Sequence, residues 1–377
     1  MIHNIRTLLT RVACLVLLAG TSRGADILVG QTAALSGPTQ ALGLGMKTGL
    51  EVAFSEVNDA GGVGGRKILL TSLDDGYEPK RAAENAHILL EQDHVFLLIG
   101  CVGTPTAIEI LPVCTADGAP FFGAFTGTGA LRTPYNPLVV NMRASYAQEI
   151  ERLVTLLVDG RGASRIACFF QDDSYGQSGL KALNASLKRR RLEPVALGSY
   201  TRNTSDVTGA IKSIVPASPE AVVMVGAYGA CSEFIKKARA LGLTKTVYCN
   251  ISFVGTRALV ERLGPDSEGV IISQVVPHPE FSSVPAVEAY RQALKRYAPA
   301  ALSDWISLEG YLEGRLFAKL VARAGPELTH ETFQAALNRP EVIDLGGINA
   351  QFGPNHNQAF DSVYLTQVSE GRIGSIK

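Results

Sequence analysis

Short apolar runs alternate with longer segments of mixed polarity along most of the chain. Each run is apolar at nearly every position, which is typical of strands covered by helices on both faces. The runs lie at residues 27–32, 67–73, 95–99, 120–125, 165–170 and 221–226. The clearest helical segments lie at about residues 42–58, 80–92, 180–190 and 233–241. This alternation predicts βαβ units, parallel sheets and right-handed crossovers.

The pattern occurs twice. The first series of units ends near residues 141–146, and the second begins with the run at residues 165–170. A chain of 377 residues is long enough for two domains, and no low-complexity linker separates the halves. A long helix predicted at residues 308–324 must then pack on one of the sheets. The sequence therefore predicts an α/β protein built from two similar halves.

The stretch at residues 95–111 carries the strongest local signal for a binding site. Gly100 and Gly103 permit a tight turn after the strand, Thr104 is predicted to cap a helix, and Pro105 suits the first helical position. Such a turn directs free backbone N–H groups and the positive helix end at the space beyond the strand. A small carboxylate or phosphate suits that space. An ordinary strand-to-helix turn would contain the same residues, so the interpretation depends on the similar turns around it.

Hydroxyl, acidic and tyrosine side chains follow other predicted strands. In open parallel sheets, ligands bind outside the carboxyl ends of the strands. The candidates at those ends are Ser36, Asp75, Gly103, Thr104, Thr126 and Thr128 in the first half, and Asp173, Tyr175, Tyr228 and Ser252 in the second half. These side chains suit a binding cleft better than catalysis. A packing role for Tyr228, a surface position for Tyr175 and a turn-forming role for Asp75 stay open.

The N-terminal segment is typical of a secretory signal peptide. Arg6 and Arg11 precede an apolar run at residues 12–20, and small residues follow near the expected cleavage point at Gly24 or Ala25. The run is too short to span a bilayer, and Arg11 disfavours a lipid anchor on Cys14. We therefore predict that residues 1–25 are removed and that the mature protein is soluble and periplasmic.

The charge balance gives no reason to expect nucleic-acid binding. Removal of residues 1–25 takes away three of the 35 basic residues and none of the 35 acidic ones, which leaves a net charge of −3. The one basic run, at residues 188–191, closes a predicted helix, where cations suit the helix dipole.

Cysteine and histidine spacing argues against several kinds of site. The mature chain keeps Cys101, Cys114, Cys168, Cys231 and Cys249, without a CxxC motif, so we expect no zinc site, redox motif or disulfide framework. The histidines are scattered, and no Walker A, dinucleotide fingerprint or nucleophile elbow occurs. We expect no metal, no cofactor and no enzymatic activity.

Several motifs together resemble the leucine/isoleucine/valine-binding proteins of ABC transporters. The motifs are residues 35–38 (LSGP) with Gly43, residues 56–66 (EVNDAGGVGGR), residues 74–79 (DDGYEP), residues 173–176 (DSYG), residues 252–255 (SFVG) and residues 308–311 (LEGY). The resemblance covers the whole mature chain. It implies a type I periplasmic-binding-protein fold, with two Rossmann-like α/β lobes joined by three crossovers. Lobe one is then expected at residues 26–143 and 274–350, and lobe two at residues 144–273 and 351–377.

The resemblance also implies roles for individual residues. The turns that hold a ligand carboxylate in amino-acid-binding members correspond here to Gly103, Thr104, Phe125, Thr126 and Thr128. Tyr175 corresponds to an aromatic residue that closes over the ligand, and Tyr228 to a second aromatic residue. The further candidates are Ser36, Leu42, Asp75, Tyr146 and Asp173.

Two positions depart from the amino-acid-binding pattern. Ser252 stands where related proteins have the acid that pairs with the ligand ammonium, and Leu42 stands where some have a tryptophan. These differences favour a ligand whose ammonium is absent or unimportant. Asp173, Glu233 or Glu309 would have to supply the missing acid for an amino acid to bind well.

The function implied by the resemblance is ligand capture between two closing lobes. The expected ligand is a small amino acid, aromatic or aliphatic carboxylate, or amide, and the expected partner is an ABC permease in the inner membrane. We expect a monomer. A ligand-sensing subunit of a membrane receptor is the alternative function, because the same fold serves both purposes.

Overall fold

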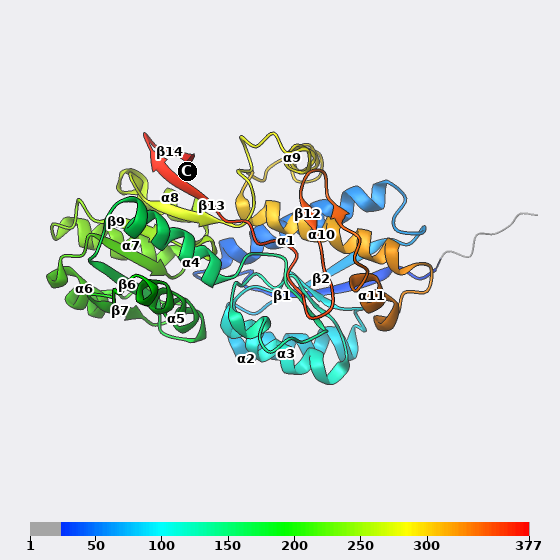
Figure 1. The fold of residues 1–377 in the computed structure, drawn as a ribbon. Helices are drawn as coiled ribbons and strands as arrows, with labels where there is room; N and C mark the ends of the chain where they lie inside the picture. The colour runs from blue at the N-terminus through cyan, green and yellow to red at the C-terminus, as the bar shows by residue number, and fades with distance from the viewer. Residues whose placement is uncertain (1–23, 377) are drawn as a thin grey trace, which may run out of the picture.

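The computed structural model describes residues 24–376, whose strands form two main sheets and a short two-stranded ribbon (Figure 1). The first sheet is parallel, with strand order β2-β1-β3-β4-β5. Its strands are β1 (Ile27–Ala33), β2 (Ile68–Asp74), β3 (Leu98–Ile99), β4 (Phe121–Phe122) and β5 (Val139–Val140). The predicted signal peptide, residues 1–25, lies almost wholly outside the described residues.

The second sheet has the order β14-β13-β10-β9-β8-β6-β7. Its strands are β6 (Ile166–Gln171), β7 (Leu197–Tyr200), β8 (Ala221–Val225), β9 (Val247–Asn250), β10 (Ile271–Gln274), β13 (Tyr364–Ser369) and β14 (Arg372–Ile376). The strands from β7 to β10 are parallel, whereas β13 and β14 pair antiparallel. The ribbon consists of β11 (Ile343–Asp344) and β12 (Asn349–Ala350). The predicted α/β class with two mostly parallel sheets is confirmed.

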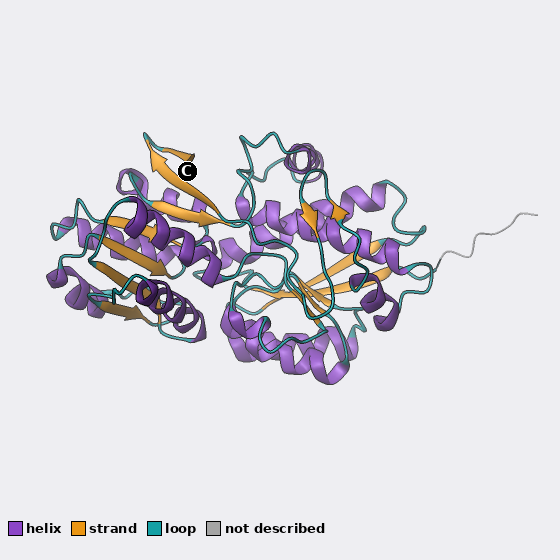
Figure 2. Cartoon of the chain, in the orientation of Figure 1, coloured by secondary structure: helices purple, strands orange, loops and turns teal. Residues whose placement is uncertain are grey.

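Helices from both ends of the chain cover the first sheet. They are α1 (Gln40–Asp59), α2 (Pro79–His87), α3 (Thr104–Asp117), α10 (Trp305–Ala324) and α11 (His330–Leu337). Helix α9 (Pro285–Tyr297) packs on α1 and α10 rather than on the sheet. Helices α1 and α10 lie side by side above this sheet (Figure 2). Glycine permits this close packing, because a Cβ atom on Gly49 would lie 2.2 Å from the Ser307 carbonyl oxygen. As expected for the long helix, α10 packs on the sheet, where Phe317 meets Phe122.

Two helices of the second lobe begin earlier than predicted. The lobe contains α4 (Tyr146–Val154), α5 (Ser174–Arg189), α6 (Thr208–Ile214), α7 (Tyr228–Ala240) and α8 (Thr256–Leu263). The predicted starts of α5 at residue 180 and α7 at residue 233 were wrong. Asp173 caps α5 by accepting a hydrogen bond from the Tyr175 N–H at 2.9 Å. Gly176 brings the helix against the strand end, because a Cβ there would lie 1.8 Å from the Gln171 carbonyl oxygen.

Three segments connect the two sheets, at residues 141–145, 275–284 and 351–363. The first and third segments are hydrogen-bonded to each other. The Asn141 N–H donates to the Asn357 carbonyl at 2.7 Å, and the Phe360 N–H donates to the Met142 carbonyl at 3.0 Å. We take these three segments as the crossovers between the predicted lobe one and lobe two.

Candidate functional site

Three buried hydroxyl groups converge where the lobes meet. Thr104 begins α3, Thr126 follows β4, and Tyr146 begins α4. The Thr104 and Thr126 hydroxyl oxygens are 2.6 Å apart, and the Tyr146 hydroxyl lies 3.3 Å from the first and 3.2 Å from the second. Burial raises the pKa of Tyr146, so its phenol keeps the proton it can donate. We call these residues the hydroxyl trio, and together they can donate hydrogen bonds to a carboxylate.

Gly103 places the first of these hydroxyls. Its backbone has a φ of 113°, and a Cβ atom there would lie 2.4 Å from the Tyr77 ring. Gly103, not Thr104, is therefore the N-cap of α3, so the predicted cap was wrong by one residue. Because Thr104 is the first helical residue, its hydroxyl bonds to Thr126 rather than to its own helix.

Five aromatic rings pack beside the hydroxyl trio. We call them the aromatic cluster: Tyr77, Phe125, Tyr146, Tyr175 and Phe253. All five side chains are buried. Tyr77 and Phe125 come from lobe one, whereas the other three come from lobe two. The Tyr175 ring lies 4.5 Å from the Phe253 ring and 5.4 Å from the Tyr146 ring, measured between centroids. This arrangement can contact an apolar or aromatic ligand body from both lobes.

A charged network borders the aromatic cluster. We call it the junction network: Arg143, Glu149, Ser252, Ser273 and Glu309. Arg143 is 1% exposed, and its guanidinium lies 4.2 Å from the Phe125 ring centroid. Its Nη2 donates to the Ser252 hydroxyl at 2.7 Å, and its Nε lies 3.0 Å from Oε1 of Glu309. The network therefore joins the first crossover to both lobes.

Glu149 holds the other side of Ser252. Its Oε2 accepts hydrogen bonds from the Ser252 N–H at 2.8 Å and from the Ser273 hydroxyl at 2.7 Å. The capping box of α4 places this side chain, because Ser145 and Gln148 fix the start of the helix on which Glu149 lies. The Glu149 carboxylate therefore lies next to Ser252, the position at which the resemblance implies an acid.

Burial dominates the ionisation of the acids near this network. It raises the pKa of Glu309 to about 7, although Arg143 acts in the opposite direction. Burial and then the nearby Glu309 raise the pKa of Glu313. Burial alone would lower the pKa of Arg143, but Glu309 and Glu149 raise it. The guanidinium therefore stays charged, whereas burial favours the protonated form of Glu313.

A second set of polar contacts joins the two lobes. Glu78 of lobe one accepts from Arg202 Nη2 at 3.0 Å and from the Asn203 side-chain amide at 2.7 Å. The Asn203 amide also donates to the Gly76 carbonyl at 3.0 Å, and Arg202 Nη1 donates to Asp173 at 3.3 Å. These contacts hold the lobes in the closed arrangement.

The structure brings most of the predicted site residues to this junction. Gly103, Thr104, Phe125, Thr126, Tyr146 and Tyr175 lie at the hydroxyl trio or the aromatic cluster. Thr128 donates its N–H to Thr126, and its hydroxyl lies 3.2 Å from that of Ser178 in lobe two. Ser252 belongs to the junction network.

The other candidates lie elsewhere or support the site indirectly. The Ser36 hydroxyl donates to Asp74 at 2.6 Å on the exposed surface. Asp75 accepts from the Tyr77 N–H at 2.7 Å, and burial raises its pKa to about 6. It therefore forms the turn that presents the Tyr77 ring.

Leu42 and Tyr228 form a separate contact between the lobes. A Cβ atom on Gly255 would lie 2.7 Å from Leu42 Cδ2 and 3.3 Å from Tyr228 Cδ1. The Tyr228 hydroxyl accepts from the Ala41 N–H at 3.4 Å. Both side chains therefore lie at the lobe interface, beside the site rather than within the hydroxyl trio.

The three acids named as substitutes for an acid at Ser252 have other partners. Asp173 caps α5 and accepts from Arg202, and Glu233 pairs with Lys237 on the surface at 3.0 Å. Glu309 pairs with Arg143. Sequence reasoning missed Glu149, Arg143 and Tyr77. The capping box was a usable signal for Glu149, whereas nothing local marks Arg143 or Tyr77.

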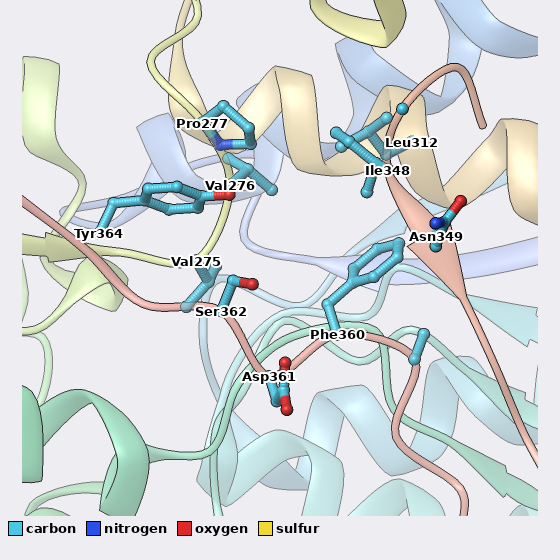
Figure 3. Close-up of a pocket in the computed structure, with 12 residues that line it drawn as sticks. Val275, Val276, Pro277, Leu312, Ile348, Asn349, Phe360, Asp361, Ser362 and Tyr364 are labelled. Carbon is cyan, nitrogen blue, oxygen red and sulfur yellow. The ribbon is translucent and has the colours of Figure 1, made fainter. Parts of the chain in front are cut away.

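A separate cavity of about 240 Å³ lies at the crossovers (Figure 3). Val275 and Tyr364 line one side of it, and Ile348 and Phe360 line the other. Its walls come largely from the second and third crossovers. None of the predicted site residues lines it. We therefore assign the candidate site to the lobe junction rather than to this cavity.

Residues 24–376 contain no group of three or more His, Cys, Asp or Glu side chains that could hold a metal ion. Within the same range, no helix combines the length and apolar character needed to cross a membrane. All five cysteines of the described chain are buried and free of disulfide bonds.

Two lobes built on mostly parallel sheets, with buried polar and aromatic side chains where they meet, are typical of a bilobal binding protein. A family model described as periplasmic binding protein matches residues 26–372. The chain therefore belongs to the periplasmic binding protein family, which is a family of binding proteins rather than enzymes.

The relatives confirm the predicted resemblance. The chain is 28% identical over 207 residues to Leu/Ile/Val-binding protein homolog 3 of Brucella melitensis, which covers 55% of each chain. It is 24% identical over 381 residues to Leu/Ile/Val-binding protein homolog 8 of Brucella suis, with 95% of this chain and 92% of that protein covered. The matched region thus spans little more than half the length of the first of these relatives.

Solved structures confirm the type I fold. A possible leucine/isoleucine/valine-binding protein from Rhodopirellula baltica SH 1 matches with a TM-score of 0.90 and 36% identity, covering 95% of this chain and 98% of that chain. A substrate-binding periplasmic protein from Ralstonia solanacearum matches with a TM-score of 0.88 and 26% identity, covering 93% of this chain and all of that one.

Proposed function

We propose that this protein is an exported solute-binding protein that closes its two lobes on a small carboxylate-bearing ligand and delivers it to an ABC importer. The observation that carries the proposal is the hydroxyl trio, which is buried between the lobes next to the aromatic cluster. Three convergent donors suit a carboxylate, and the surrounding rings suit an apolar or aromatic ligand body. The family and the predicted signal peptide support export to the periplasm.

The fold is compatible with more than one ligand body. A Streptococcus pneumoniae substrate-binding protein of this fold was crystallised with isoleucine, and one from R. palustris was crystallised with benzoate. Their identities to this chain, 16% and 18%, are too low to transfer either ligand. The aromatic cluster leads us to favour aromatic and branched aliphatic ligand bodies. An acid at position 252 is replaced here by Glu149, but the Arg143 guanidinium bonds the same serine, and this positive charge leads us to favour carboxylates without an ammonium over α-amino acids.

A ligand screen tests the proposal on the purified mature chain. We expect aromatic and branched aliphatic carboxylates to raise the melting temperature, while the corresponding alcohols do not. A ligand held at 100 times its dissociation constant adds about 2.7 kcal/mol of stability. Thr104→Val should weaken carboxylate binding, whereas Thr106→Val is a control, since the Thr106 hydroxyl bonds only within its own turn. Equal shifts with acids and alcohols would contradict the proposal.

Replacing Tyr175 with alanine should weaken ligand binding at least tenfold. Truncation of a buried aromatic anchor commonly costs about 2 kcal/mol or more, and Tyr175 lies against both Tyr146 and Phe253. Tyr175→Phe should bind almost normally, because the ring provides the contact and its hydroxyl makes only a long 3.5 Å bond to the Gly226 carbonyl. Calorimetry measures both variants. Lost stability of the unliganded protein with unchanged affinity would assign Tyr175 to the core instead.

A further inference from the structure

Polar atoms in the junction network are buried without partners. Within the described chain, Nη1 of Arg143 and Oε1 of Glu149 have no hydrogen-bond partner, and neither side-chain atom of the Asn250 amide has one. Arg143 is 1% exposed, and Glu149 and Asn250 are fully buried. Leaving such groups unpaired is costly, and the cost is largest for charged groups. The two unsatisfied atoms of the charged groups, Arg143 Nη1 and Glu149 Oε1, therefore point to a ligand group at the lobe junction.

The unpaired donor and the unpaired acceptor lie around one residue. The Arg143 guanidinium bonds the Ser252 hydroxyl through Nη2, and the Glu149 carboxylate bonds the Ser252 N–H through Oε2. The free Nη1 and Oε1 belong to these same two groups. Arg143 also stacks on Phe125, and Phe253 follows Ser252 in the chain. The free atoms thus border the aromatic cluster that would hold the ligand body.

We infer that the junction network forms a second polar subsite, which receives a neutral carboxamide group at the other end of a carboxylate ligand. The inference deepens the proposed function and rests on it. The amide C=O would accept from Arg143 Nη1, and its N–H would donate to Glu149 Oε1. A single neutral group would then satisfy one buried donor and one buried acceptor.

Charge excludes the simpler alternatives. A second carboxylate on the ligand would be repelled by Glu149 and would compete with Glu309, which already pairs with Arg143. A ligand ammonium would be attracted by Glu149 but repelled by the Arg143 guanidinium. An apolar group would leave both buried atoms unpaired. A neutral group with adjacent donor and acceptor atoms can pair with both Arg143 Nη1 and Glu149 Oε1.

Matched ligands test the inference by calorimetry. On an aliphatic scaffold the probes are succinamate, its shape-matched apolar analogue 4-methylpentanoate, and succinate. On an aromatic scaffold they are 4-carbamoylbenzoate, 4-isopropylbenzoate, terephthalate and 4-(aminomethyl)benzoate. On the scaffold that binds, we expect the amide to bind at least tenfold more tightly than its apolar analogue and more tightly than the charged analogues.

Variants tie that preference to the subsite. Glu149→Gln replaces an acceptor with a mixed donor and acceptor of the same shape, so it should reduce the amide preference severalfold while the apolar analogue binds as before. Ser252→Ala perturbs the same subsite without removing a charge and serves if Glu149→Gln does not fold. Ser267→Ala is the matched control, because Ser267 is buried but bonds only the Gly264 carbonyl.

The outcomes separate the two proposals. If no carboxylate in either series binds, the proposed function fails. If carboxylates bind but the amide has no advantage over its apolar analogue, the second subsite alone is overturned. The second subsite is likewise overturned if the amide preference is unchanged in both Glu149→Gln and Ser252→Ala.

Discussion

Replacing Arg143 with methionine is expected to lower the free energy of unfolding by about 3–5 kcal/mol. The arginine is 1% exposed and lies 3.0 Å from Glu309, and it also bonds Ser252 across the lobe junction. Methionine keeps much of the apolar volume on Phe125 but removes the counter-charge of Glu309, so the buried carboxyl must either ionise without a partner or take up a proton. The cost arises mainly from leaving the buried Glu309 carboxyl without its partner, rather than from the net value of the pair itself.

A double variant separates the cost of leaving Glu309 without a partner from the net value of the ion pair. In Arg143→Met/Glu309→Gln no unpaired charge remains at that pair, so we expect it to regain a large part of the lost stability. Urea unfolding of the unliganded protein measures both variants. Arg296→Met is the control for losing an arginine, because both Arg296 and its partner Asp59 are exposed, and little change is expected there. A single variant as stable as the parent would show that Arg143 is not an essential counter-ion.

The fold and part of the candidate site could be predicted from the sequence for the same physical reason. Carboxyl ends of parallel strands meet at one edge of a sheet, so the residues that follow them come together wherever the alternating pattern is right. Thr104 and Thr126 follow neighbouring strands β3 and β4, and their hydroxyls are 2.6 Å apart. Tyr175 follows β6 in lobe two, and its ring centroid lies 5.4 Å from that of Tyr146.

The junction network could not be predicted in this way. Arg143 lies on a crossover, Glu149 in the first turn of α4, and Glu309 on a helix 166 positions after Arg143. Their meeting depends on how the two lobes close, which hydrophobic periodicity does not encode. The predicted start of α5 was wrong for a related reason, which involves a glycine. Gly176 is a loop signal by propensity, but here it permits a close helix-to-strand contact that only the folded structure reveals.

The stability of the unliganded protein is expected to fall as the pH rises from about 5 to 7. Burial raises the pKa of Glu309 to about 7 and that of Asp75 and Asp304 to about 6, and it also raises the pKa of Glu313. Between its unfolded and folded pKa, each acid stays protonated in the folded chain but ionises in the unfolded one. The unfolded state therefore binds fewer protons, and the free energy of unfolding decreases with pH.

The size of this effect follows from the shifts. A change from 4.5 to about 7 makes the Glu309 contribution on the order of 3 kcal/mol, fully present below about pH 4.5 and lost once the pH passes 7. Acids with lowered pKa values, such as Glu151 at about 2, are ionised in both states above pH 5 and do not oppose it. His278 does oppose it, because burial lowers its pKa and stability then rises toward pH 6.5.

Glu309→Gln isolates the largest of these contributions. We expect the variant to lose stability less steeply between pH 5 and 7, by nearly one proton in the slope of unfolding free energy against pH. The slopes are compared rather than the absolute stabilities, because Glu309→Gln also removes the ion-pair partner of Arg143 and so changes the absolute stability. Glu288→Gln should leave the slope unchanged, since a bond from Arg291 lowers the pKa of that exposed carboxyl. Urea unfolding at several pH values measures all three proteins, and parallel curves for Glu309→Gln and the parent would mean that Glu309 is ionised throughout this range.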